Sequence, residues 1–82
     1  MSKTELGIIG IIVKNRESAS QINEVLHRYS GIIVGRLGIP YHERSISIIS
    51  VAVDGSPEDV SSLTSDIAAI PGVSAKSVIT ED

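Results

Sequence analysis

The residues best suited to chemistry are gathered in one short segment, GRLGIPYHERS, which spans residues 35–45. Its candidate ligand-binding side chains are Arg36, Tyr41, His42 and Arg44. Two guanidinium groups and two ring donors suit a carboxylate or a phosphate, because arginine presents a planar fork of N–H donors that matches either group. The segment therefore predicts a binding corner for a small anion or an acidic partner protein.

The same segment can also be interpreted as an exposed hairpin end whose charged side chains have no binding role. In that interpretation Tyr41 packs on Pro40 and Arg36 pairs with Glu43. Charged hairpin ends of this kind are common on protein surfaces. The two interpretations differ in what the arginines contact, so a structure can separate them.

A second candidate for anion binding is Asn15, which lies between Lys14 and Arg16 at the expected start of a helix. Free backbone N–H groups at a helix N-terminus attract anions. Asn15 is also a favourable N-cap residue, whose side-chain oxygen accepts a hydrogen bond from the first turn. The sequence is compatible with both roles.

The residue types do not favour catalysis or metal binding. The chain has no cysteine and two histidines, His27 and His42, and neither histidine has a second ligand at the spacing that metal sites use. No nucleophile has an evident base partner. We therefore expect a protein with no enzymatic activity, no metal and no cofactor.

The charge balance argues against binding to nucleic acid or to membranes. Seven Lys and Arg residues stand against ten Asp and Glu residues, for a formal net charge of −3, whereas DNA-binding surfaces gather cations on one face. The apolar run LGIIGIIV, residues 6–13, has eight residues, and a membrane span needs about 20. We expect no direct DNA binding by this chain alone, no membrane attachment and a cytoplasmic location.

Hydrophobic periodicity predicts six elements in the order strand, helix, strand, strand, helix, strand. The first helix has an apolar face at helical spacing, formed by Ile22, Val25, Leu26 and Tyr29. Gly31 suits the left-handed position that ends this helix. The second helix begins at the Ser56-Pro57 cap and ends at Pro71-Gly72. The strands are expected over 6–14, 31–39, 45–54 and 73–79.

This order of elements is typical of an α+β fold, the ferredoxin-like βαββαβ plait. Two split βαβ units with right-handed crossovers give a four-stranded antiparallel sheet with both helices on one face. The first and third strands are then central, and the second and fourth lie at the edges. A chain of 82 residues is expected to form a single domain, residues 1–82.

The first strand is apolar at both parities, with Ile8 and Ile12 on one and Ile9 and Ile11 on the other. The helices cover one face of the sheet, and a second copy of the chain is the simplest cover for the other. We expect a homo-oligomer, a dimer or tetramer, with Ile9 or Ile11 as the outward residue to test. In the third strand the apolar parity changes at Ile48–Ile49, which predicts either a bulge or burial of both faces.

Three segments carry a resemblance to a known family: GIIGIIVKNRESA, INEVLHRYSGIIVGRLGIPYHERSISIISVAVDG and IPGVSAKSVI. Together they cover nearly the whole chain, and they resemble the iron-only hydrogenase system regulator family. The resemblance implies an ACT-like fold, similar to the C-terminal domain of the nickel-responsive repressor. The nickel site of that repressor needs several histidines and a cysteine, and this chain lacks that set.

The resemblance implies a regulatory protein of ACT-like type that acts by oligomerising and by binding a small ligand or a protein. The loop that amino-acid-binding ACT domains use contains glycine, whereas Lys14-Asn15-Arg16 has none. The alternative is a structural module that docks on another protein and has no small-molecule ligand. Stabilisation by a ligand separates the two, because a bound metabolite raises the melting temperature by mass action.

Overall fold

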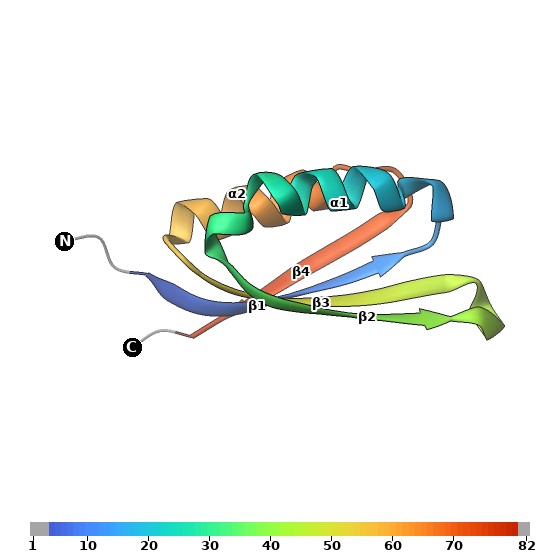
Figure 1. Ribbon diagram of the computed structural model, residues 1–82, viewed down its shortest axis with the longest axis horizontal. Coiled ribbons are helices and arrows are strands. Elements are labelled where there is room, and N and C mark those ends of the chain that lie inside the picture. Colours follow the sequence, from blue (N-terminus) through green and yellow to red (C-terminus); the bar gives the residue numbers. More distant parts are fainter. Residues whose placement is uncertain (1–3, 81–82) are drawn as a thin grey trace.

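All four strands of the described chain lie in one antiparallel sheet, and both α-helices pack on the same side of it (Figure 1). The computed structural model describes residues 4–80. Along the chain the strands and α-helices are β1 (Glu5–Val13), α1 (Ala19–Arg28), β2 (Ile33–Tyr41), β3 (Ile46–Gly55), α2 (Pro57–Ala68) and β4 (Val73–Ile79). One-turn 3-10 helices lie between them: η1 (Arg16–Ser18), η2 (Ser30–Ile32) and η3 (His42–Arg44).

The strands are ordered β2-β3-β1-β4 across the sheet. The central pair runs in register from Glu5 opposite Gly55 to Val13 opposite Ser47. β4 pairs with the other edge of β1. The ferredoxin-like plait predicted from the sequence is confirmed, with β1 and β3 at its centre.

Both predicted helix caps are present. The Asn15 side-chain oxygen accepts a hydrogen bond from the Glu17 amide at 3.0 Å, and the first turn is the 3-10 helix η1, so α1 itself begins at Ala19. Ser56 caps α2 by accepting from the Asp59 amide at 3.1 Å, and a proline follows it at the start of the helix. These short side chains satisfy amide groups that have no partner inside the helix.

The predicted left-handed conformation of Gly31 is wrong. In residues 4–80 the glycine with positive φ is Gly72, at +76°. After α1 the chain enters η2, where the Ile32 amide donates to the Tyr29 carbonyl at 3.0 Å. This tight turn gives a carbonyl at the helix end a hydrogen-bond partner without any residue in the left-handed conformation.

The predicted bulge at Ile48–Ile49 is also wrong. β3 pairs with β1 without interruption, and the irregularity lies in β2, between Ile33 and Gly35. Ile49 packs against the core, whereas Ile48 is on the opposite face and is 40% exposed. Apolar side chains therefore lie on both faces of one regular strand, but burial of both faces, the other predicted possibility, does not hold within one chain because Ile48 is exposed.

The core lies between the sheet and the two helices. On the central strands it takes alternate residues, and Ile9, Ile11, Val51 and Val53 are fully buried. The helices contribute Ile22, Val25, Leu26, Val60, Leu63 and Ile67. Because the odd-numbered residues of β1 face the helices, the expectation that Ile9 or Ile11 points outward is wrong. The even-numbered residues point outward.

The side of the sheet away from the helices carries no element of the described chain (Figure 1). We call this side the open face. Its large apolar side chains are all exposed, from 40% for Tyr41 and Ile48 to 73% for Val78. They are Leu6, Ile8, Ile12, Val34, Leu37, Ile39, Tyr41, Ile48 and Val78. So many exposed large apolar side chains on one face of a sheet are unusual on a monomer.

A side-chain hydrogen bond joins the end of α1 to α2. The Tyr29 hydroxyl, just after α1, donates to the Asp66 carboxylate on α2 at 2.8 Å. This hydrogen bond raises the pKa of Tyr29, because ionisation would remove the donated proton and place two negative charges together. The helix layer is thus held together by a polar contact as well as by the core.

Gly72 and Gly31 give a matched test of backbone conformation. A Cβ on Gly72 would lie 2.8 Å from the Asn15 Cβ, at a positive φ, whereas a Cβ on Gly31 meets nothing within 4 Å. We expect Gly72→Ala to lower the free energy of unfolding by about 1–2 kcal/mol or more. Gly31→Ala should change it by less than about 1 kcal/mol. Urea unfolding followed by circular dichroism measures both, and equal losses would contradict the assignment.

Candidate functional site

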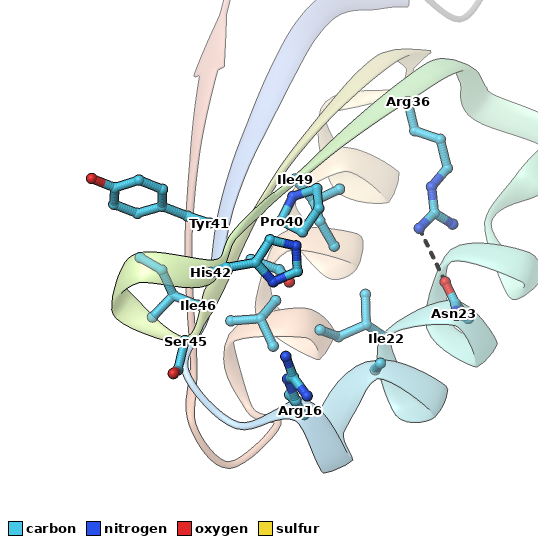
Figure 2. Close-up of a pocket in the computed structure, with 13 residues that line it drawn as sticks. Arg16, Ile22, Asn23, Arg36, Pro40, Tyr41, His42, Ser45, Ile46 and Ile49 are labelled. Atoms are coloured by element: carbon cyan, nitrogen blue, oxygen red, sulfur yellow. Dashed lines mark hydrogen bonds between the residues drawn. The ribbon is translucent and has the colours of Figure 1, made fainter.

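A cavity of about 300 Å³ lies between the N-terminal half of α1 and the end of the β2–β3 hairpin (Figure 2). Its apolar lining includes Val13, Ala19, Ile22, Pro40 and Ile49. Its polar lining includes Arg16, Asn23, Arg36, His42, Ser45 and Ser47. The volume is at the lower end of the range for small-molecule sites, about 300–1,000 Å³.

The hairpin turn sets the position of His42 at the mouth of the cavity. Ser45 adopts a left-handed conformation, with φ of 54°, and its amide donates to the His42 carbonyl at 3.1 Å. This closes η3 and brings the chain back into β3. Figure 2 shows the imidazole of His42 directed over the cavity, with Arg16 of η1 on the opposite wall.

Arg36 reaches the cavity because of the irregularity in β2. Ile33 and Arg36 have opposite parity, yet their pairing partners Val53 and Val51 are both fully buried on the helix side. The register shift after Ile33 allows both residues to face the helices. Without it, Arg36 would lie on the open face.

The Arg36 guanidinium is oriented by α1. One of its terminal nitrogens donates to the Asn23 side-chain oxygen at 3.0 Å (Figure 2). Both residues are exposed, and a guanidinium carries five N–H donors, so other donors are left for a ligand. The predicted alternative, a pairing of Arg36 with Glu43, is not the contact that the structure shows.

The charge of the lining is positive. Arg16 and Arg36 both contribute to it, His42 adds an imidazole ring, and no Asp or Glu belongs to the lining residues. This local excess contrasts with the formal net charge of −3 for the chain. A positive recess on an acidic protein concentrates anions near it.

The predicted site residues are only partly brought together. Arg36, Tyr41 and His42 belong to the lining, but the ring of Tyr41 points away from the cavity (Figure 2). Arg44 lies on η3 and is exposed, outside the lining, and Asn15 caps η1. Sequence reasoning did not join Arg16 to this site, since twenty residues separate it from Arg36.

Two further observations concern the described residues as a whole. Residues 4–80 contain no group of three or more His, Cys, Asp or Glu side chains arranged to hold a metal ion. In the same range, no helix has the length and apolar character that crossing a membrane requires.

The sequence matches the model of the TM1266-like family over residues 5–77. The chain belongs to this family. Its description reads "Iron-only hydrogenase system regulator, putative". A sequence comparison with curated proteins gives no match.

Several solved structures share the fold. The protein TM1266 from Thermotoga maritima has a TM-score of 0.91 and 28% sequence identity, over 96% of this chain and 100% of that one. The C-terminal domain of MgtC from Mycobacterium tuberculosis has a TM-score of 0.70 and 11% identity, over 99% and 93%. The nitrogen regulatory PII-like protein CPII from Thiomonas intermedia K12 has a TM-score of 0.61 and 18% identity, over 98% and 96%.

Polar residues of η1 and β2 should divide into those that support the fold and those that do not. Arg16→Gln and Arg36→Gln should change the free energy of unfolding by less than about 0.5 kcal/mol, because both side chains are exposed. Ser18→Ala should cost about 1–3 kcal/mol, because the buried Ser18 hydroxyl donates to the Pro71 carbonyl at 2.6 Å. Urea unfolding measures all three, and a large loss in either arginine variant would make that arginine a structural residue.

Proposed function

We propose that this chain is a non-catalytic regulatory protein of the iron-only hydrogenase system that binds a small anionic ligand and acts as a homo-oligomer. The observation that carries the ligand-binding part is the cavity: two arginines and a histidine stand around an apolar floor with no acidic residue among them. Membership of the TM1266-like family supports the regulatory role.

The chemistry of the lining favours a ligand with two parts. A carboxylate or phosphate suits Arg16 and Arg36, since a guanidinium binds either group through paired N–H donors. A short aliphatic body suits the floor around Ile22 and Ile49. The cavity volume of about 300 Å³ limits the ligand to a small molecule and excludes a folded peptide.

Adenine nucleotides belong among the probes because of one structural neighbour. CPII from Thiomonas intermedia K12 was solved with ADP, AMP and bicarbonate, and also with ADP, AMP and acetate. At 18% and 16% identity these structures share the fold with this chain. They supply candidates to test at the cavity: a nucleotide phosphate and a small carboxylate.

Assembly is supported by the open face. Ile8 on β1, Leu37 on β2 and Val78 on β4 are 53%, 62% and 73% exposed, and all three lie on the open face. Burying apolar surface gains roughly 25 cal/mol per Å². A second copy of the chain covers this surface in the simplest way, because closed two-fold pairs are the commonest oligomers.

Ligand binding should appear as thermal stabilisation. We expect leucine, 2-oxoisocaproate, inorganic phosphate or AMP to raise the melting temperature, with the largest rise for the probe that satisfies both the arginines and the apolar floor. A probe at about 100 times its Kd adds about 2.7 kcal/mol, which for a domain of this size is a rise of about 10 °C or more. Differential scanning fluorimetry measures the rise, and calorimetric titration gives the Kd.

Charge variants test whether a response comes from the cavity. Arg16→Gln and Arg36→Gln should each weaken binding by about tenfold or more, since each removes a charge-assisted hydrogen bond. Arg28→Gln is the matched control, because Arg28 is also an exposed arginine but lies at the C-terminal end of α1, outside the lining. If Arg28→Gln weakens binding equally, or if no probe shifts the melting temperature, the protein is better described as a docking module without a small ligand.

A charged side chain introduced on β1 at a position of the open face tests whether the protein assembles through that face. Ile8→Asp should give a folded monomer at micromolar concentration where the natural chain is oligomeric, because a carboxylate would be buried in an apolar interface. Ile9→Asp, at a fully buried neighbouring position, should prevent folding. Light scattering and circular dichroism distinguish these outcomes. A natural chain that is monomeric with the open face exposed would contradict the assembly.

A further inference from the structure

The open face has two unlike ends. At one end the ring of Tyr41 stands out from β2, 40% exposed and directed away from the cavity (Figure 2). At the other end is an apolar hollow of about 260 Å³, lined by Leu6, Ile8, Val34, Ala52 and Val78. We call these features the Tyr41 knob and the apolar hollow.

The strand register places the two features far apart. Tyr41 pairs with Ile46 at the hairpin end of the sheet. Gly35, beside the hollow, pairs with Ala52, six residues further along β3. At about 3.3 Å per residue the knob and the hollow are roughly 20 Å apart, so Tyr41 cannot fill the hollow of its own chain.

We propose that two copies of this chain pack open face to open face about a two-fold axis that runs across the strands, so that each Tyr41 knob enters the apolar hollow of the other copy. This inference rests on the assembly in the proposed function and adds its geometry. A two-fold axis makes the contact reciprocal. The knob of each copy lies against the hollow of the other, so the same contact forms twice.

The charge of the open face favours a second copy as the occupant. Among the strand residues that point to this side, the charged ones are Asp54 on β3 and Lys76 on β4, one of each sign. A surface so nearly neutral offers little to a highly charged partner such as a nucleic acid. It suits a surface of its own composition, which is apolar with few charges.

The size of the open face also fits a pair of copies. β1, β2 and β3 have nine or ten residues and are about 30 Å long, β4 has seven residues, and the four strands side by side span about 20 Å. The plane is therefore roughly 600 Å², and the relief of the side chains adds accessible area to it. This approaches the roughly 800 Å² per partner that stable interfaces bury.

The direction of the axis follows from the knob and the hollow. An axis along the strands would place hollow against hollow and knob beside knob, leaving an unfilled apolar volume at one end. Unfilled volume loses van der Waals contacts that interiors normally make. An axis across the strands fills each hollow with a ring. It passes near Gly10 and Ser50, which are paired with each other and are small enough for the sheets to approach closely.

The polar residues at the two ends are compatible with the same arrangement. Asp54 lies at the hollow end, opposite Leu6, and η3 lies at the knob end with two basic residues, His42 and Arg44, on either side of Glu43. The pairing brings the Asp54 carboxylate of each copy toward η3 of the other. Lys76 pairs with Gly10, so the two copies of Lys76 lie near each other at the axis, and because β4 is an edge strand their long side chains can turn out to solvent.

Substitutions of Tyr41 test whether the knob contributes to the stability of the dimer. Tyr41→Ala should raise the dimer dissociation constant at least tenfold, because an aromatic side chain seated in an apolar pocket is typical of interface hot spots. Tyr41→Phe keeps the ring and should stay within about threefold of the natural chain. Sedimentation equilibrium measures both constants. If Tyr41→Ala leaves the dissociation constant unchanged in a dimeric protein, the knob is not in the interface and the proposed geometry is overturned.

Cross-linking tests the direction of the axis, and the natural chain has no cysteine to interfere. Asp54→Cys and Glu43→Cys place thiols at opposite ends of the sheet while keeping Tyr41 and the hollow intact. With a short bis-maleimide, a mixture of the two variants should give mainly the mixed product, Asp54→Cys joined to Glu43→Cys. Each variant alone should cross-link at least fivefold more slowly. Glu24→Cys, on the helix side, is the control for random collision.

The outcomes separate this inference from the proposed function. A dimer in which Glu43→Cys joins to itself as fast as in the mixture has its axis along the strands, which overturns the geometry and leaves face-to-face assembly standing. A natural chain that is monomeric at 100 µM overturns both. Mixed cross-links together with a Tyr41→Ala dimer that dissociates more readily support the arrangement.

Discussion

The packing of the odd-numbered residues of β1 and β3 against α1 and α2 is the interaction on which the rest of the structure depends. Ile9 and Ile11 on β1 and Val51 and Val53 on β3 have no exposed surface, and they meet a helix layer whose inner residues are at most 6% exposed. Because side chains alternate along a strand, this choice also fixes the residues that face away from the helices. The open face is a direct consequence of the core.

The cavity arises where that helix layer ends. The β2–β3 hairpin extends to η3 at the same end of the molecule as the turn η1 that precedes α1 (Figure 1). Residues of η1, α1 and this hairpin line the cavity. There the apolar residues at the end of the core, such as Val13 and Ile49, meet polar side chains from η1, α1 and η3. A recess at the boundary between core and solvent can therefore combine an apolar floor with a charged rim, which is the common composition of small-molecule sites.

Sequence reasoning succeeded for most features whose cause is local, with the conformation of Gly31 as the exception. The caps at Asn15 and Ser56 and the stop at Gly72 depend on neighbours within a few residues, and the apolar spacing of the helices is read along a single element. The order of elements then restricted the topology to few choices. The whole fold class was predictable for these reasons.

The site was less predictable because its causes are tertiary. The direction of Arg36 depends on a register shift between Ile33 and Gly35, which arises from pairing with β3. The contact of Arg36 with Asn23 and the approach of Arg16 join segments that are distant in sequence. For the same reason the alternating isoleucines of β1 could not reveal which parity the helices would cover.

The two-sided use of β1 limits how the sequence of this strand can evolve. A substitution at an odd position disturbs the helix contacts, and one at an even position changes the open face. Gly7 has little freedom, since a Cβ there would lie 3.1 Å from the Val78 carbonyl oxygen. Neutral drift should therefore concentrate on the solvent-facing sides of α1 and α2, and new binding specificities should arise at the hairpin end, where substitutions leave the central strand untouched.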